Sequence, residues 1–178
     1  IQDRDFTTVR AFLSRGIALD KTHNSRLPLQ EAIVFEDIDM LKLLLGSGAN
    51  VNAKTTCGDT ALHTACFMGK ENVVKMLLAK GAEVNVHGEY GSTPLHEACA
   101  SGNLRVVMQL LVAGAERDTE DKFGRKPIAY AAQWNRDEVG SFLGKPNKKL
   151  PQDDEIELIG IAFLRDHLRT ADKTIPIF

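Results

Sequence analysis

Two histidines and two cysteines carry the side chains with which this sequence could bind a metal or form a thiol site. His63 and His96 are separated along the chain by the same interval as Cys66 and Cys99. If this spacing places the members of each pair one structural layer apart, they are about 8–10 Å from each other, the distance between packed helices. Such a distance is too long for a shared zinc ion or a disulfide. We therefore predict no metal and no cofactor, and interpret both histidines as buried rings that hydrogen-bond to the backbone.

The other reactive side chains form no catalytic pattern. Cys57 is the third cysteine, and an odd number without CxxC spacing argues against a disulfide framework, so we expect free thiols. The pair Asp153 and Asp154 lies in a polar run of the kind that starts a solvated helix. The sequence contains neither a glycine-rich phosphate loop after a strand nor a GxSxG motif. We predict that the chain is not an enzyme.

Charge and hydropathy exclude further classes of function. The formal net charge of −2 over 178 residues gives no field that would attract nucleic acid. No apolar run approaches the roughly 18 residues that cross a bilayer, and residues 1–20 lack the apolar centre of a signal peptide. We expect a cytoplasmic or nuclear protein with no nucleic-acid partner and no membrane insertion. The sequence does not indicate an oligomeric state.

The elements that position these side chains recur at one fixed interval. The register is kept by four alanines and by three glycines near the ends of successive units. They are Ala32, Ala65, Ala98 and Ala131, and Gly48, Gly81 and Gly114. Four tripeptides fall on the same spacing: Leu27–Leu29, Thr60–Leu62, Thr93–Leu95 and Lys126–Ile128. Self-similarity at a period of about 20 to 50 residues indicates a solenoid of stacked supersecondary units.

Each unit is expected to contain two short antiparallel helices and a hairpin loop. Thr60 can cap the first helix, Pro94 suits the first helical position in the next unit, and Gly69 ends the helix in a left-handed conformation. The apolar stripe of the second helix is formed by Val73, Val74, Leu77 and Leu78. Residues 81–91 contain three glycines and an asparagine, as in an extended loop or β-hairpin. We predict an all-α solenoid in which stacking of the units creates one continuous core.

The unit at 88–120 resembles the ankyrin repeat. The signature T-P-L-H-x-A of that family is present as Thr93-Pro94-Leu95-His96-Glu97-Ala98. The unit at 55–87 carries it with one change. Gln30 and Ala129 replace the histidine in the outer units, so we expect its polar bridge to be absent from both. The resemblance covers about residues 5–145 and implies a stack of four to five ankyrin repeats, including truncated or degenerate ends.

The period divides the chain into a repeat domain and a tail. The domain spans 1–145, with half a repeat at 1–21 and repeats at about 22–54, 55–87, 88–120 and 121–146. Residues 147–178 contain a hinge and a C-terminal helix or tail. Ile161-Ala162-Phe163 follows Ile128-Ala129-Tyr130 by one full period, so the tail is either a degenerate capping repeat or a separate segment.

The resemblance also implies a binding surface. In ankyrin proteins the hairpin tips and the exposed side of the first helix line a concave groove that binds partner proteins. A short solvent-facing helix has no folding reason to end in large apolar side chains, whereas protein interfaces are enriched in them. The residues that we predict to contact the partner are Phe35, Phe67, Met68, Tyr90, Ser101, Lys122, Arg125, Gln133 and Trp134. The alternative is that the apolar members pack in the core or under the tail.

These patterns predict an interaction module that binds another protein, or a peptide segment, in the groove and on the hairpin tips. Two alternatives stay open. In the first, the chain is an adaptor whose tail recruits a second factor, because residues 150–168 resemble the segments by which some ankyrin proteins reach ubiquitin ligases. In the second, it is the regulatory domain of a larger enzyme or channel.

Overall fold

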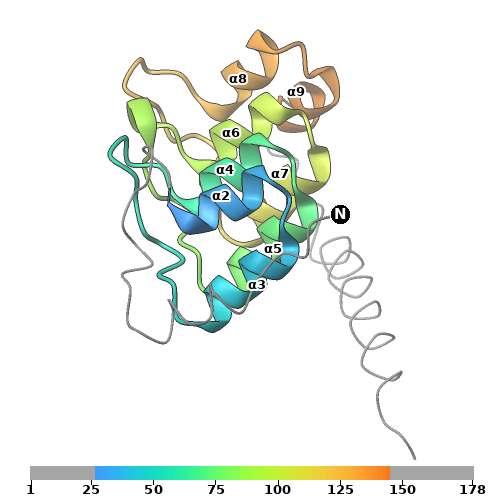
Figure 1. Cartoon of the computed structure of the whole chain (residues 1–178). Coiled ribbons are helices and arrows are strands. Elements are labelled where there is room, and N and C mark those ends of the chain that lie inside the picture. The colour runs from blue at the N-terminus through green and yellow to red at the C-terminus, as the bar shows by residue number, and fades with distance from the viewer. Residues whose placement is uncertain (1–26, 145–178) are drawn as a thin grey trace, which may run out of the picture. The chain divides into compact units, whose positions relative to one another are not determined.

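The computed structural model describes residues 27–144, which lie in one compact unit ending at Gly144. That range contains eight α-helices, one turn of 3-10 helix and no β-strand, which confirms the predicted all-α class (Figure 1). None of these helices has the length and hydropathy needed to cross a membrane. The predicted half repeat at 1–21 and the predicted tail at 147–178 lie outside the described residues.

The helices form four pairs, and each pair belongs to one repeat. The first helices are α2 (Pro28–Val34), α4 (Ala61–Phe67), α6 (Pro94–Ser101) and α8 (Pro127–Gln133). The second helices are α3 (Ile38–Gly46), α5 (Glu71–Ala79), α7 (Leu104–Val112) and α9 (Asp137–Leu143). Contacts run along the first helices from α2 through α4 and α6 to α8, and along the second helices from α5 through α7 to α9. The units are therefore stacked in sequence order (Figure 1).

The local sequence fixes where the first helices begin and end. Thr60 and Thr93 are N-caps with extended backbones, as predicted, and each takes part in a capping box. Gly69 and Gly102 follow the helices with φ values of 63° and 80°, a left-handed conformation that glycine adopts at little cost. Asn135 occupies the corresponding position after α8, also with positive φ. Each first helix is therefore held to seven or eight residues.

The core lies between the two rows of helices. Leu62 and Leu95, on first helices of adjacent repeats, are fully buried. On the second helices, the predicted apolar stripe buries Val74 and Leu77 in one repeat and Val107 in the next. Each unit therefore buries its apolar side chains partly against its own helix pair and partly against its neighbours.

The loops are hairpin-shaped but form no β-ladder in the described residues. Each tip is closed by a bond from an amide to the carbonyl four residues later. The bonds are Thr55 N to Asp59 O at 2.9 Å, Gly88 N to Ser92 O at 2.8 Å and Asp121 N to Arg125 O at 3.0 Å. Between the last two tips the Lys122 amide donates to the Tyr90 carbonyl at 2.9 Å. The predicted hairpins are thus tight turns that stack on one another without becoming strands.

Two asparagines link consecutive repeats at the opposite end of the loops. Asn52 donates from Nδ2 to the Gly81 carbonyl at 3.1 Å and accepts from the Glu83 amide at 2.8 Å. Asn85, at the equivalent position of the next repeat, makes both bonds again with the Gly114 carbonyl and the Glu116 amide, each at 3.0 Å. This pair of bonds, which we call the asparagine clasp, joins each unit to the next at two successive junctions.

Candidate functional site

The two histidines are structural, as the sequence predicted. The Nδ1 atom of His63 accepts from the Thr60 amide at 3.2 Å, and its Nε2 lies 3.2 Å from the Ser92 carbonyl oxygen of the next repeat. His96 makes the same two contacts, with the Thr93 amide and the Arg125 carbonyl oxygen, each at 3.0 Å. Because Nδ1 accepts, the proton of the neutral ring is on Nε2, which donates to the carbonyl. Burial lowers the pKa of both rings and favours this neutral form.

The prediction for Gln30 was wrong, whereas the one for Ala129 was right. Oε1 of Gln30 accepts from the Leu27 amide at 3.1 Å, and Nε2 donates to the Thr60 carbonyl of the next repeat at 3.4 Å. A side-chain amide offers an acceptor and a donor, so it can replace both nitrogens of the imidazole. Ala129 has no such group, and the N-cap of its helix, Lys126, makes no side-chain capping bond.

The cysteines are free and two of them are inert. Cys66 and Cys99 are completely buried. Burial raises the pKa of both thiols, that of Cys99 to about 12. Such thiols are poor nucleophiles at neutral pH. Cys57 is exposed at a loop tip. Among residues 27–144 no group of three or more His, Cys, Asp or Glu residues could hold a metal ion.

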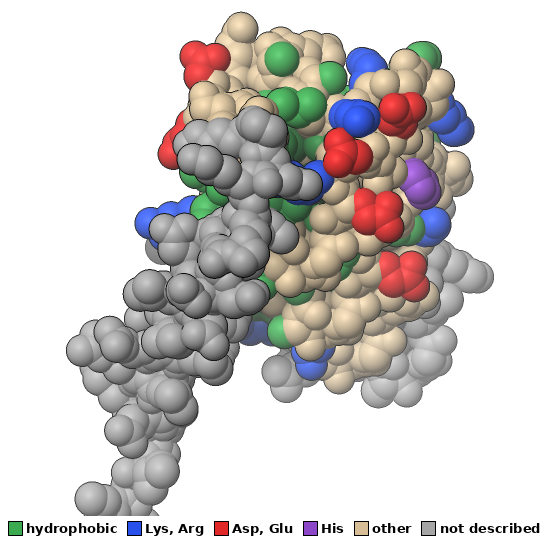
Figure 2. Space-filling model, turned by 180° about the vertical axis from the view of Figure 1, so that it is seen from behind, with side chains coloured by type: hydrophobic (Ala, Val, Ile, Leu, Met, Phe, Trp, Pro, Cys, Tyr) green, Lys and Arg blue, Asp and Glu red, His purple; other side chains and the backbone are tan. Residues whose placement is uncertain are grey.

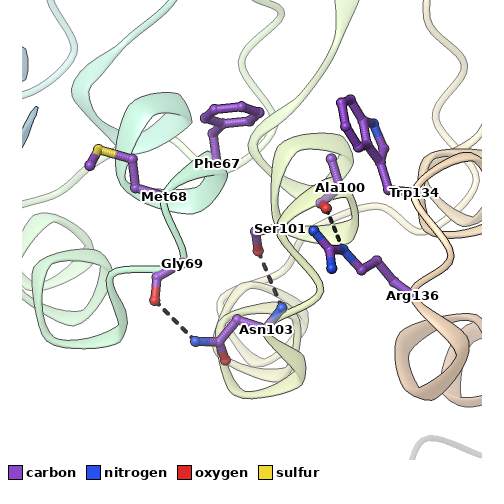
Figure 3. Close-up of a pocket in the computed structure, with 8 residues that line it drawn as sticks. All are labelled: Phe67, Met68, Gly69, Ala100, Ser101, Asn103, Trp134 and Arg136. Atoms are coloured by element: carbon purple, nitrogen blue, oxygen red, sulfur yellow. Dashed lines mark hydrogen bonds between the residues drawn. The ribbon is translucent and has the colours of Figure 1, made fainter.

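A hollow of about 320 Å³ lies at the C-terminal ends of the first helices of three successive repeats (Figure 3). Its lining consists of Phe67, Met68, Gly69, Ala100, Ser101, Asn103, Trp134 and Arg136. The period explains its shape. The middle repeat carries Ala100 and Ser101, which are small, while the flanking repeats carry Phe67 and Trp134. The small side chains form the floor and the rings form the two walls.

Both aromatic walls are open to solvent. The Phe67 side chain is 57% exposed and Trp134 is 51% exposed, so neither ring belongs to the core. Met68 is half-buried and packs against the core, so it supports the hollow as well as lining it. The alternative that these rings pack in the core therefore does not hold for Phe67 or Trp134, whereas packing under the tail concerns residues outside the described range.

Hydrogen bonds fix the polar part of the hollow (Figure 3). Asn103 caps α7 with its Oδ1 and donates from Nδ2 to the Gly69 carbonyl at 3.0 Å. Arg136 donates from Nε to the Ala100 carbonyl at 2.9 Å. Our sequence prediction missed both residues. The signal was present, because Asn103 and Arg136 occupy one repeat position, directly after the left-handed residue that ends the first helix.

A second group, which includes three of the predicted contact residues, lies at two adjacent loop tips and on α8. We call Tyr90, Lys122, Phe123, Arg125 and Tyr130 the tip cluster. The ring centroids of Tyr90 and Phe123 are 5.9 Å apart. The guanidinium of Arg125 lies 5.0 Å from the ring centre of Phe123 and 4.8 Å from that of Tyr130, within cation–π range. Rings from two adjacent repeats are thus in contact with each other and with the Arg125 guanidinium.

The buried side chain of Asp121 forms hydrogen bonds with three residues of the tip cluster. Its carboxylate accepts from the amides of Phe123 and Arg125, from Nε of Arg125 at 2.8 Å and from the Tyr130 hydroxyl at 2.9 Å. Burial opposes ionisation of Asp121, but these hydrogen bonds outweigh it and lower its pKa to about 2. Burial and the bond to Asp121 raise the pKa of Tyr130 to about 12. The Arg125 charge is thus already paired within the molecule.

Seven of the nine predicted contact residues fall into two sets. Phe67, Met68, Ser101 and Trp134 line the hollow, while Tyr90, Lys122 and Arg125 belong to the tip cluster. Gln133 is exposed and its Oε1 lies 3.5 Å from a terminal nitrogen of Arg125. Phe35, although 69% exposed, lines neither surface. On the face shown in Figure 2, acidic and basic side chains of the described residues are interspersed.

Comparison with known proteins identifies the repeat. A family model described as ankyrin repeats (3 copies) matches residues 1–88 and 84–154. No curated protein matches the chain. Ankyrin repeats generally act in protein–protein interaction and are typically non-catalytic binding modules.

Proposed function

The chain belongs to the ankyrin-repeat family, and we propose that it binds a protein or peptide segment in the hollow between Phe67 and Trp134 and on the tip cluster. One observation carries the proposal. Two aromatic side chains, each more than half exposed, face the same space from repeats that are not adjacent. Folding gains little from them at these positions, whereas a ligand placed between them would bury both rings.

The composition of the two surfaces supports this function. Energetically important interface residues are enriched in Trp, Tyr and Arg, and they cluster where a partner excludes water. The hollow supplies Trp134 and Phe67 with a floor of small side chains, which leaves room for a side chain of the partner. The tip cluster adds the exposed rings of Tyr90 and Phe123. Lys122 and Gln133, both exposed, would form part of a polar rim.

The test separates folding from binding. We expect the double variant Phe67→Ser, Trp134→Ser to keep its free energy of unfolding within about 1 kcal/mol, because exposed side chains contribute little. The same variant should lose the proteins that the wild-type chain captures from a lysate, measured by quantitative mass spectrometry. Val112→Ser removes an exposed apolar side chain from α7, outside both surfaces, and is the matched control. If the double variant captures the same proteins as the wild-type chain and the control, the hollow is not the binding site.

A further inference from the structure

Arg136 brings a positive charge to the wall of the hollow and is held there by two contacts. Its Nε donates to the Ala100 carbonyl at 2.9 Å. Its aliphatic stem crosses Gly102, where an added Cβ would lie only 2.5 Å from Arg136 Cδ. The absence of a side chain at residue 102 therefore makes room for the arginine. Figure 3 shows the guanidinium beside Ala100, with Trp134 above it.

Most of the donors of this guanidinium remain available. A guanidinium has five N–H groups, and within residues 27–144 the Arg136 side chain makes only the bond to Ala100. Lys70 occupies the same repeat position one unit before Asn103, but its charge is paired with Glu36. Arg125 is paired with Asp121. Arg136 differs from both because none of the ion pairs in the described part of the chain includes it.

The rest of the hollow cannot neutralise this charge. Arg136 is the one charged residue in the lining, and the other polar side chains there, Ser101 and Asn103, are engaged with the Ala98 and Gly69 carbonyls. A partner that covers the hollow removes water from the guanidinium. Such a complex is costly unless the partner supplies an acceptor, and a carboxylate supplies both charge and two-pronged geometry.

From this complementarity we propose that the hollow receives a segment of a partner protein in which a large apolar side chain lies beside an Asp or Glu residue. The apolar side chain fits between Phe67 and Trp134, over Ala100. The carboxylate pairs with the terminal nitrogens of Arg136. This inference rests on the proposed function and adds the chemical class of the partner.

The first experiment is a selection that does not presuppose a sequence. A phage library of random nine-residue peptides is selected on the immobilised full chain, and again on the Phe67→Ser, Trp134→Ser variant. We expect the peptides that require the two rings to carry Asp or Glu within two residues of Phe, Trp, Leu or Met. If ring-dependent peptides show no enrichment of Asp or Glu, the inferred partner class is wrong and the proposed function stands. If no ring-dependent peptide is recovered, the proposed function fails and the inference fails with it.

The second experiment assigns the carboxylate to Arg136. The selected peptide and its Glu→Gln or Asp→Asn form are titrated against the wild-type chain and Arg136→Gln by fluorescence polarisation. Each single change should raise Kd roughly tenfold, the scale of one charge-assisted hydrogen bond, and the two together should cost no more than either one. Additive losses would place the carboxylate elsewhere.

A charge control and a folding control accompany these titrations. Arg105→Gln removes a positive charge from α7, where the side chain is 80% exposed and lies 3.9 Å from Glu71. This variant should bind the peptide as the wild-type chain does, and an equal loss would indicate a general charge effect that contradicts the pairing with Arg136. If Arg136→Gln does not fold by circular dichroism, the change in the peptide still decides, since an unchanged Kd of the neutral peptide for the wild-type chain overturns the inference.

Discussion

At the scale of single residues, His63 and His96 act as uncharged connectors between repeats. Each ring accepts a hydrogen bond from the capping turn of its own unit and donates one to the loop of the next. A protonated ring has no acceptor and would lose the bond from the threonine amide. The stability of the stack is therefore coupled to the protonation of two buried side chains.

This coupling predicts a dependence of stability on pH. Burial lowers the pKa of both rings in the folded chain below the value of about 6.5 expected in the unfolded chain. Their contribution is therefore complete above pH 6.5 and is lost as the pH falls through the folded pKa. The double variant His63→Gln, His96→Gln cannot titrate, and Gln30 shows that glutamine can make both kinds of bond.

Urea unfolding at pH 7.5, 6.5 and 5.5 measures the effect. We expect the wild-type chain to lose more unfolding free energy over this interval than the double glutamine variant. The single variants His63→Gln and His96→Gln each keep one of the two buried rings, so each should lose an amount between those of the wild-type chain and the double variant. Identical slopes for the wild-type chain and the double variant would show that the two rings are not the coupled groups.

Residue types predicted the histidines better than they predicted Gln30 or Arg136. The ankyrin signature specifies a histidine because of two bonds that it makes, and the sequence alone did not show that Gln30 could make equivalent ones. The role of Arg136 depends on its reach to the Ala100 carbonyl of a different repeat. Such a distance exists only in the folded stack, so a pattern within one unit could not reveal it.

At the scale of elements, short helices are bounded by backbone conformation. Helices of seven to nine residues are marginal in isolation, and their ends must be defined by caps and by tertiary contact. Gly69 and Gly102 supply left-handed ends. Glu36 reaches the same conformation after α2 without being glycine, with a φ of 55°. The ends at Gly69 and Gly102 were predictable from sequence, whereas nothing in the residue type indicated the conformation of Glu36.

Two glycines with the same left-handed conformation allow the effect of backbone strain to be measured apart from the effect of a side-chain contact. Gly102 and Gly81 have φ values of 80° and 83°, but an added Cβ meets Arg136 only at residue 102 and nothing within 4 Å at residue 81. We expect Gly102→Ala and Gly81→Ala each to lose about 1–2 kcal/mol of unfolding free energy from the left-handed backbone. Only Gly102→Ala should displace Arg136 and weaken binding of the selected acidic peptide.

Denaturant titration and fluorescence polarisation on the same two proteins provide the measurement. Equal peptide affinities for the two variants would mean that Gly102 does not position Arg136. Because the displaced atoms belong to a flexible side chain, the difference in stability between the variants should stay small.

In the loops, the sequence predicted the chain reversal but not whether the loops would form β-strands. Glycine and asparagine in residues 81–91 predicted a chain reversal, and the Gly88–Ser92 bond closes one. A strand needs a ladder of successive bonds with a neighbour. The tips of adjacent repeats share the bond from Lys122 to Tyr90, which depends on how the units stack. Composition within one unit does not determine that geometry.

At the scale of the whole molecule, the side chains that stabilise the stack and those that we propose to bind a partner lie in different parts of each repeat. Leu95 is 1% exposed on α6, which contacts α4 on one side and α8 on the other. Phe123 is 65% exposed at a loop tip. The period of the sequence predicted this division, because the apolar columns that repeat became core and several large residues that do not repeat remained at the surface.

Matched truncations test the division. Leu95→Ala should cost about 2–5 kcal/mol of unfolding free energy, the usual loss for a buried leucine. Phe123→Ala should cost less than about 1 kcal/mol, since its ring is mostly solvated. Urea unfolding monitored by far-ultraviolet circular dichroism compares them. Comparable losses for both variants would contradict the separation of core from surface.

The hollow is a property of three repeats taken together. The sequence indicated four of its residues, Phe67, Met68, Ser101 and Trp134, but their assignment to a partner remains a prediction. What the sequence did not indicate was the open hollow between these residues. It exists because small residues in the middle unit separate large ones on either side, and because Arg136 reaches across the end of α6.

The asparagine clasp has a consequence for how such a chain can grow. Asn52 and Asn85 use the same two bonds at successive junctions. A duplicate of residues 55–87 inserted after His87 would therefore meet a matching carbonyl and amide on each side. Units joined in this way are interchangeable. The array could therefore gain or lose whole repeats during evolution, and so change its exposed surface, while the same two hydrogen bonds form at each junction.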